Sequence, residues 1–105
     1  MDEKKYRICL TVPLGRRDGS LTIRETDGRA EGRLDVMGEK NPFAGQLSGD
    51  GTLKIAGTLR TLVDIIPYTA TGKIAGGEIR LTLKAASGAE YAICGKEMEN
   101  DDEAV

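Results

Sequence analysis

Apolar and polar side chains alternate along most of this chain, in short runs that are separated by turn residues. In the first run Tyr6, Ile8 and Leu10 alternate with Arg7 and Cys9. Successive side chains of a β-strand point to opposite faces, so this period predicts a strand with one buried face and one solvated face. Similar runs recur along the chain, and the sequence therefore predicts an all-β protein.

Glycine-containing turn signals separate the runs. They are Arg17-Asp18-Gly19, Asp27-Gly28, a loop over 38–42, Ser48-Gly49-Asp50-Gly51, Ala75-Gly76-Gly77 and Ser87-Gly88. A turn about every 9 to 15 residues is typical of β-sandwiches and barrels. Short turns join antiparallel neighbours, so we expect an up-and-down meander of about eight short strands.

No segment of helical length is available to cover the apolar face of such a sheet. An open sheet would also leave two unpaired edges, whereas closure removes the edges and buries the apolar face. We therefore expect a small closed or partly open barrel. This architecture resembles the calycin and streptavidin type of meander, and the resemblance covers topology without a matching motif.

Five glycines fall at positions that are expected to face inward. They are Gly32, Gly45, Gly57, Gly72 and Gly95. Glycine lets a strongly bent barrel turn its corners, and it can also leave space for a ligand. We favour curvature, because a barrel of eight strands is only wide enough to fill itself or to hold one small molecule.

The alternation breaks near Pro67. We interpret 62–74 as a strand with a β-bulge beside Pro67, because valine, isoleucine and threonine dominate there and proline cannot donate to a ladder. The alternative is a short helical turn over 59–66. Its apolar residues have the helical spacing i, i+3, i+4, i+7, and they are Leu59, Leu62, Val63 and Ile66.

Charge separates the chain into a domain over 1–96 and an acidic tail over 97–105. The tail holds five of the 17 acidic residues, which leaves 12 against 15 basic residues in the rest of the chain. We expect the tail to be solvated and disordered.

No signal peptide and no membrane-spanning run is evident, so we expect a cytoplasmic protein with reduced cysteines and no membrane partner. Closure of the barrel would pair the first and last strands, which carry Cys9 and Cys94 on their polar faces. Whether the two thiols are close stays open at this stage, and we favour two unrelated small residues.

The chain contains no histidine. This excludes Ser-His and Cys-His nucleophile pairs and histidine-ligated metals, and the two cysteines do not have zinc-site spacing. We therefore expect no enzymatic activity, no catalytic residue, no metal and no cofactor. Acidic residues are interspersed among the basic ones, and the aromatic residues have core parity, which argues against binding of nucleic acid.

Two hypotheses for function follow. The first is a barrel that binds a small apolar or amphipathic ligand at its mouth, with residues 62–66 as a lid. Its candidate lining residues are Phe43, Leu62, Ile66, Tyr68 and Tyr91. The second is a protein-interaction or scaffold module, such as a homodimer, with a packed interior. A large interior cavity would favour the first hypothesis and a filled barrel the second.

Overall fold

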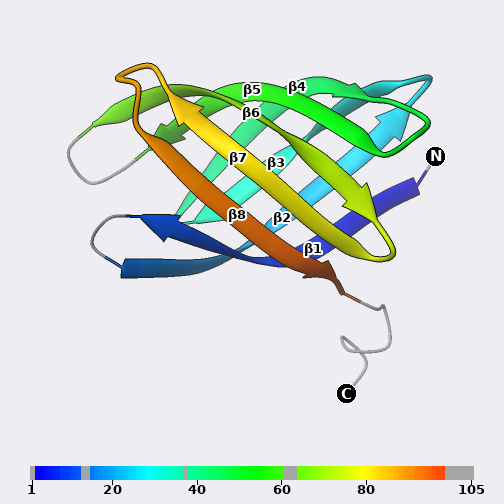
Figure 1. Cartoon of the computed structure of the whole chain (residues 1–105), viewed down its shortest axis with the longest axis horizontal. Coiled ribbons are helices and arrows are strands. Elements are labelled where there is room, and N and C mark those ends of the chain that lie inside the picture. Colours follow the sequence, from blue (N-terminus) through cyan, green and yellow to red (C-terminus); the bar gives the residue numbers. More distant parts are fainter. Residues whose placement is uncertain (1, 13–14, 37, 61–63, 99–105) are drawn as a thin grey trace.

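The computed structural model describes residues 2–12, 15–36, 38–60 and 64–98, and every regular element in these ranges is a β-strand. The strands are β1 (Asp2–Val12), β2 (Gly15–Thr26), β3 (Arg29–Val36), β4 (Glu39–Leu47), β5 (Thr52–Arg60), β6 (Ile65–Ala75), β7 (Glu78–Ala85) and β8 (Glu90–Glu97). Each strand pairs antiparallel with the next, and β8 pairs with β1 to close the barrel (Figure 1). The predicted meander barrel is therefore confirmed, and its closure is complete.

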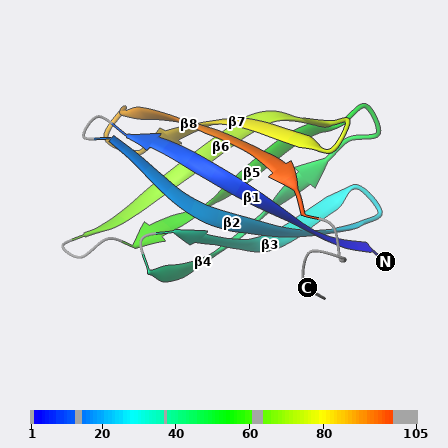
Figure 2. The same cartoon turned by 90° about the horizontal axis from the view of Figure 1, so that it is seen from below.

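The barrel is flattened, with principal extents of 35 × 33 × 19 Å. In Figure 2, β7 and β8 run along one side of the molecule and β3 and β4 along the other. The alternate residues that the sequence assigned to the inner face fill the space between these walls. The largest apolar side chains among those that are less than 2% exposed are Tyr6, Leu10, Leu21, Leu34, Leu53, Leu59, Ile79, Leu83 and Ile93. Burial of each such side chain stabilises the fold by about 1.5–3 kcal/mol relative to exposure.

The inward glycines allow neighbouring strands to approach closely. A Cβ atom at Gly32, Gly45, Gly72 or Gly95 would collide with a backbone carbonyl oxygen of the paired strand. These carbonyls belong to Thr22, Lys54, Arg80 and Arg7 respectively. At Gly57 the nearest atom, the Pro42 carbonyl oxygen, would lie 2.7 Å away. Backbone rather than empty space adjoins these positions, which argues against the alternative that the glycines leave space for a ligand.

The expected turn at Arg17-Asp18-Gly19 is wrong. These residues lie inside β2, where Asp18 pairs with Cys9 and Gly19 faces inward. A Cβ at Gly19 would collide with the carbonyl oxygen of Asp35, so this glycine serves close packing. The long ladder between β1 and β2 overrides a local turn preference. By contrast, Asp27 and Gly28 have φ values of 53° and 83° and form the predicted hairpin turn between β2 and β3.

The expected β-bulge beside Pro67 is wrong. β6 begins at Ile65, and its pairing with β5 runs without interruption from Arg60 opposite Ile65 to Thr52 opposite Lys73. The residues of the proposed helical turn that the structure describes as regular, 59–60 and 65–66, are in strands. Leu62 and Val63 lie outside the described residues.

Asn41 corrects the prediction of a loop over 38–42. β4 already begins at Glu39, and Asn41 is only 1% exposed. Its amide nitrogen donates to the Leu34 carbonyl oxygen at 3.0 Å and to the Glu39 carbonyl oxygen at 3.3 Å. Its amide oxygen accepts from the Arg60 backbone N–H at 2.8 Å. One buried side chain thus ties β3 and β4 to the end of β5.

Candidate functional site

Phe43 and Tyr68, two candidates for a ligand pocket, are part of the core. Their side chains are 5% and 4% exposed. Phe43 pairs across strands with Gly32, and Tyr68 pairs with Gly57. A Cβ at Gly57 would lie 3.2 Å from both the Phe43 Cβ and the Tyr68 hydroxyl oxygen. The two aromatic side chains therefore fill the space above the glycines, an arrangement that stabilises glycine within sheets.

The Tyr68 hydroxyl is buried and has no hydrogen-bond partner among the described residues. Burial raises the pKa of Tyr68 to about 12, because the phenolate would lose its hydration. Tyr6 is also buried, and its pKa is raised by burial and further by the charge of Glu97. Both phenols therefore stay protonated near pH 7. Neither has the pKa near the operating pH that an acid–base catalyst needs.

Ile66 and Tyr91, two further candidates, lie near the same end of the barrel. Both are half-buried and pack against the core, and the neighbouring Ile65 is 55% exposed. Leu62 lies outside the described residues. Ile65 and Ile66 are the first residues of β6, so this half of the proposed lid is part of the barrel wall. Of the candidate lining residues that the structure describes, Phe43 and Tyr68 are thus core residues, and Ile66 and Tyr91 are half-buried.

A groove on the outside of the barrel was not foreseen from the sequence. Its volume is about 600 Å³. It is lined by residues 29–31 of β3, 44–46 of β4, 54–56 of β5 and 69–71 of β6. We call this surface the outer groove. Because it involves four consecutive strands and no residue of the opposite wall, it opens to solvent and not to the barrel interior.

Two cross-strand rows of outward side chains form the outer groove. One row consists of Arg29, Gln46, Lys54 and Thr71, and the other of Glu31, Ala44, Ala56 and Thr69. All eight side chains are exposed. In the second row, the two middle strands, β4 and β5, carry the small side chains of Ala44 and Ala56. These short side chains leave the backbone of the twisted sheet accessible and form the concave floor of the outer groove.

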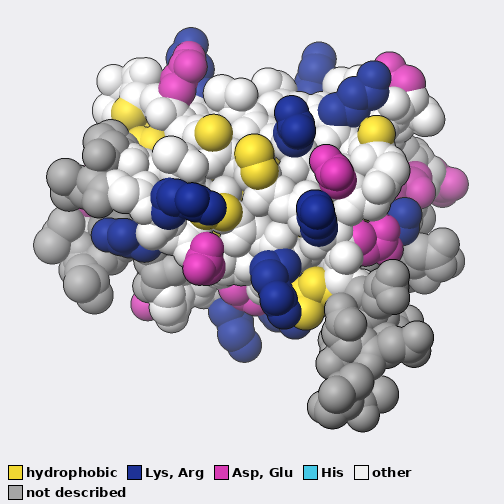
Figure 3. All heavy atoms as spheres, turned by 60° about the horizontal axis from the view of Figure 1, so that its bottom comes forward, with side chains coloured by type: hydrophobic (Ala, Val, Ile, Leu, Met, Phe, Trp, Pro, Cys, Tyr) yellow, Lys and Arg dark blue, Asp and Glu magenta, His cyan; other side chains and the backbone are white. Residues whose placement is uncertain are grey.

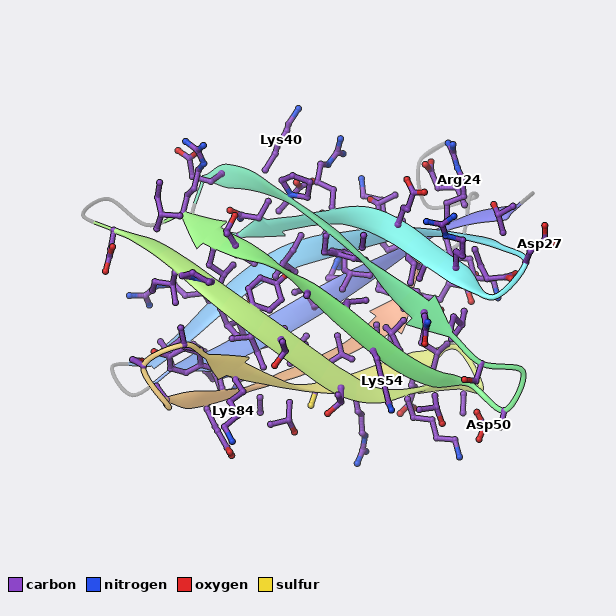
Figure 4. The ribbon with its side chains drawn as sticks, turned by 90° about the horizontal axis from the view of Figure 1, so that it is seen from above. Arg24, Asp27, Lys40, Asp50, Lys54 and Lys84 are labelled. Atoms are coloured by element: carbon purple, nitrogen blue, oxygen red, sulfur yellow. The ribbon has the colours of Figure 1, made fainter. Side chains whose placement is uncertain are left out.

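Charged side chains border this small-residue floor. Figure 4 views the wall of β4, β5 and β6 from outside, with Lys54 over β5. Arg29 lies in the same row as Lys54, and Glu31 ends the second row. The outer groove therefore combines an aliphatic floor, threonine hydroxyls and a mainly basic first row.

The described residues contain no cluster of three or more histidine, cysteine, aspartate or glutamate side chains arranged to hold a metal ion. In the same part of the chain, no helix has the length and apolarity needed to cross a membrane. Comparisons with protein-family models, with curated proteins and with solved structures find no match to this chain. The candidate site therefore rests on its own geometry.

Register is the information that sequence reasoning lacked. The alternation already assigns Ala44 and Ala56 to the outer face, where exposed small residues attract no attention individually. Only the pairing of Ala44 with Ala56, and of both with Glu31 and Thr69, shows that they form one floor. A row of small residues across several strands is thus a surface feature that a single sequence cannot reveal.

Proposed function

We propose that this chain is a non-enzymatic binding module whose outer groove holds an extended segment of a partner protein. The observation that carries the proposal is the outer groove itself, whose volume is about 600 Å³ and whose floor is formed by alanine side chains. The packing of Phe43 and Tyr68 over inward glycines supports a structural role for the barrel interior.

The closed topology supports one mode of binding over another. In the closed barrel each strand pairs on both sides, so a partner gains little by adding a strand to an edge. Recognition must then use side chains on the outer face. Four strands at about 4.8 Å spacing span roughly 14 Å, which corresponds to about four residues of an extended chain.

The charges of the outer groove favour an acidic residue in the bound segment. Arg29 and Lys54 lie in one row and would attract a carboxylate, whereas Glu31 lies in the other row. Ala44 and Ala56 allow the backbone of the segment to approach the sheet. Specificity then comes from charge at the border and from close fit at the floor.

The experiment is selection of a phage-displayed library of random peptides on the wild-type protein, followed by calorimetry with the selected peptides. Ala56→Arg fills the floor and should weaken binding by at least about tenfold, or 1.4 kcal/mol. Ala92→Arg is the matched control, because Ala92 is an exposed alanine on β8, outside the outer groove. This variant should bind within about twofold of wild type. Failure to enrich any peptide, or equal binding by Ala56→Arg, would contradict the proposal.

A second candidate function, binding of a small apolar ligand at the barrel end, has one observation in its favour. Exposed Ile65 lies beside half-buried Ile66 there, and half-buried Tyr91 lies toward the same end. Thermal-shift measurements with 8-anilinonaphthalene-1-sulfonate and fatty acids test this alternative. Stabilisation that Ile66→Ser removes and Ala56→Arg leaves intact would favour it over the outer groove.

A further inference from the structure

Cys9 and Cys94 lie directly opposite each other where the barrel closes. They are register partners on β1 and β8, so the interpretation of two unrelated small residues is wrong. Both side chains point outward, since the adjacent Ile8 and Ile93 are buried. Both cysteines are free thiols, with Cys94 exposed and Cys9 half-buried. We call this pair the seam thiols.

The position of the seam thiols in the ladder sets their separation. Met98 N–H donates to the Lys5 carbonyl oxygen at 2.7 Å, which marks that pair as hydrogen-bonded. Hydrogen-bonded and non-hydrogen-bonded pairs alternate, and Cys9 lies four residues from Lys5 in the same register, so it belongs to the hydrogen-bonded class. The Cα atoms of such a pair are about 5.5 Å apart, within the usual range for disulfides.

A disulfide at this position would be strained. Cβ atoms of hydrogen-bonded pairs lie about 5.5 Å apart, whereas a disulfide requires about 3.8 Å. The two strands would have to move together or twist locally at the seam. Strain of this kind makes a disulfide easier to reduce, which is a property of regulatory rather than permanent bridges.

Basic side chains surround the seam thiols. Arg16 Nε lies 3.2 Å from Cys9 Sγ, and this hydrogen bond is the main cause that raises the pKa of Arg16. The neighbouring outward positions on β1, β7 and β8 hold Arg7, Arg80 and Lys96. Asp18 faces Cys9, and Glu78 faces Lys96. In Figure 3, lysine and arginine side chains spread over this face, with acidic side chains between them.

The basic side chains around the seam thiols favour an anionic reaction partner. The thiolate is the nucleophile in disulfide exchange. A co-reactant with carboxylates is attracted to the same basic side chains.

We propose that Cys9 and Cys94 form a reversible disulfide across the β1–β8 seam, by exchange with an anionic low-molecular-weight disulfide of the glutathione type. The Cys9 thiolate attacks one sulfur of that disulfide, whose S–S bond breaks, and a mixed disulfide and one thiolate result. The Cys94 thiolate then attacks Cys9 Sγ and displaces the second small thiolate. Two protein thiols are oxidised, the small disulfide is reduced to two thiols, and these take up the two cysteine protons.

The experiment treats the folded protein with oxidised glutathione and follows its mass. Wild type should end lighter by two hydrogen atoms, with Cys9 and Cys94 peptides joined, whereas Cys9→Ser and Cys94→Ser should each stop as a mixed disulfide with one glutathione. Reduced glutathione should then restore both thiols without denaturant. A wild type that stops at the mixed disulfide, or a bridge that resists reduction in the folded protein, would overturn the proposal.

Rates test the role of the surrounding charge. Arg16→Ala should slow the reaction by at least about threefold at neutral pH. Arg17→Ala is the matched control and should react like wild type, because Arg17 contacts the Arg16 carbonyl and not a thiol. Oxidised glutathione is anionic and cystamine is cationic, so the ratio of their reaction rates measures the attraction of negative charge. This ratio should be higher for the folded protein than for the urea-unfolded protein, and added salt should lower the ratio of the folded protein. Equal ratios in both states would refute attraction of an anionic co-reactant.

Discussion

Replacement of Asn41 by alanine should destabilise the barrel more than its small change in volume suggests. The change removes two hydrogen bonds from the amide nitrogen and one to the amide oxygen. The Leu34 carbonyl oxygen loses one hydrogen bond but keeps its ladder partner, the backbone N–H of residue 41, at a cost of about 1 kcal/mol. The Arg60 N–H loses its partner in a partly buried site, at a cost of about 1 kcal/mol. We expect a loss of about 2 kcal/mol in the free energy of unfolding, which corresponds to a Tm lower by roughly 10 °C.

Asn41→Asp keeps the size of the side chain and separates its donor role from its acceptor role. The introduced group accepts from Arg60 N–H in either protonation state, but it can donate to the Leu34 carbonyl only when protonated. Burial raises the pKa of the introduced carboxyl, so the unfolded chain loses this proton at a lower pH than the folded protein. Stability relative to wild type is therefore retained below about pH 4, and above that pH it falls by about 1.4 kcal/mol per pH unit until the folded carboxyl ionises.

Urea unfolding followed by circular dichroism at pH 4 and pH 7 measures both effects. Gln46 provides the matched controls, because it is an exposed amide on the same strand. Gln46→Ala should stay within about 0.5 kcal/mol of wild type, and Gln46→Glu should show no comparable pH dependence. If Asn41→Ala is as stable as wild type, or if Asn41→Asp loses no stability between pH 4 and pH 7, the tie between β3, β4 and β5 is not energetically important.

Three further predictions follow from packing, burial and closure. Gly72→Ala should lower the free energy of unfolding by at least about 2 kcal/mol, because the added Cβ would collide with the neighbouring backbone. Gly49→Ala is the control and should be near neutral, since nothing lies within 4 Å of an added Cβ there. Urea unfolding of the two variants measures the difference. The free energy of unfolding should fall as pH rises from about 10, where the Tyr68 phenol of the unfolded chain ionises, to about 12, where the buried phenol of the folded protein ionises. Tyr68→Phe should remove the part of this fall that Tyr68 causes, which unfolding curves at alkaline pH measure. A disulfide between Cys9 and Cys94 closes a loop of about 86 residues. It should stabilise the fold by up to about 4.6 kcal/mol, reduced by the strain energy of the disulfide. A higher Tm of the oxidised protein would show this stabilisation.

The strand pattern could be predicted from sequence because its cause is local. Alternation with period two assigns each residue to a face wherever one face is buried, and it placed Leu34 and Ile93 in the core correctly. Closure followed from the absence of a covering helix. The prediction failed at Asp18-Gly19, where a good turn sequence lies inside a long ladder. Turn preference is worth less than the combined pairing of two long strands.

The candidate sites depend on register, which one sequence does not contain. Ala44 and Ala56 are unremarkable until pairing places them side by side, and Asn41 reads as a loop residue until its three partners surround it. The aromatic candidates failed for a related reason. The sequence shows that Tyr68 faces inward, but not that Gly57 lies opposite and leaves room for its ring.

The two proposed sites lie on opposite walls of one closed structure. The seam thiols belong to the pairing of β1 with β8, and the centre of the outer groove belongs to the pairing of β4 with β5, four strands away in either direction. Ala56→Arg should therefore leave the rate of Cys9 oxidation unchanged, and Cys94→Ser should leave peptide affinity unchanged. Coupling between them would have to pass through the shared core. Because interiors of this kind are packed to high density, such coupling would mean that oxidation of the seam alters the twist of the whole barrel.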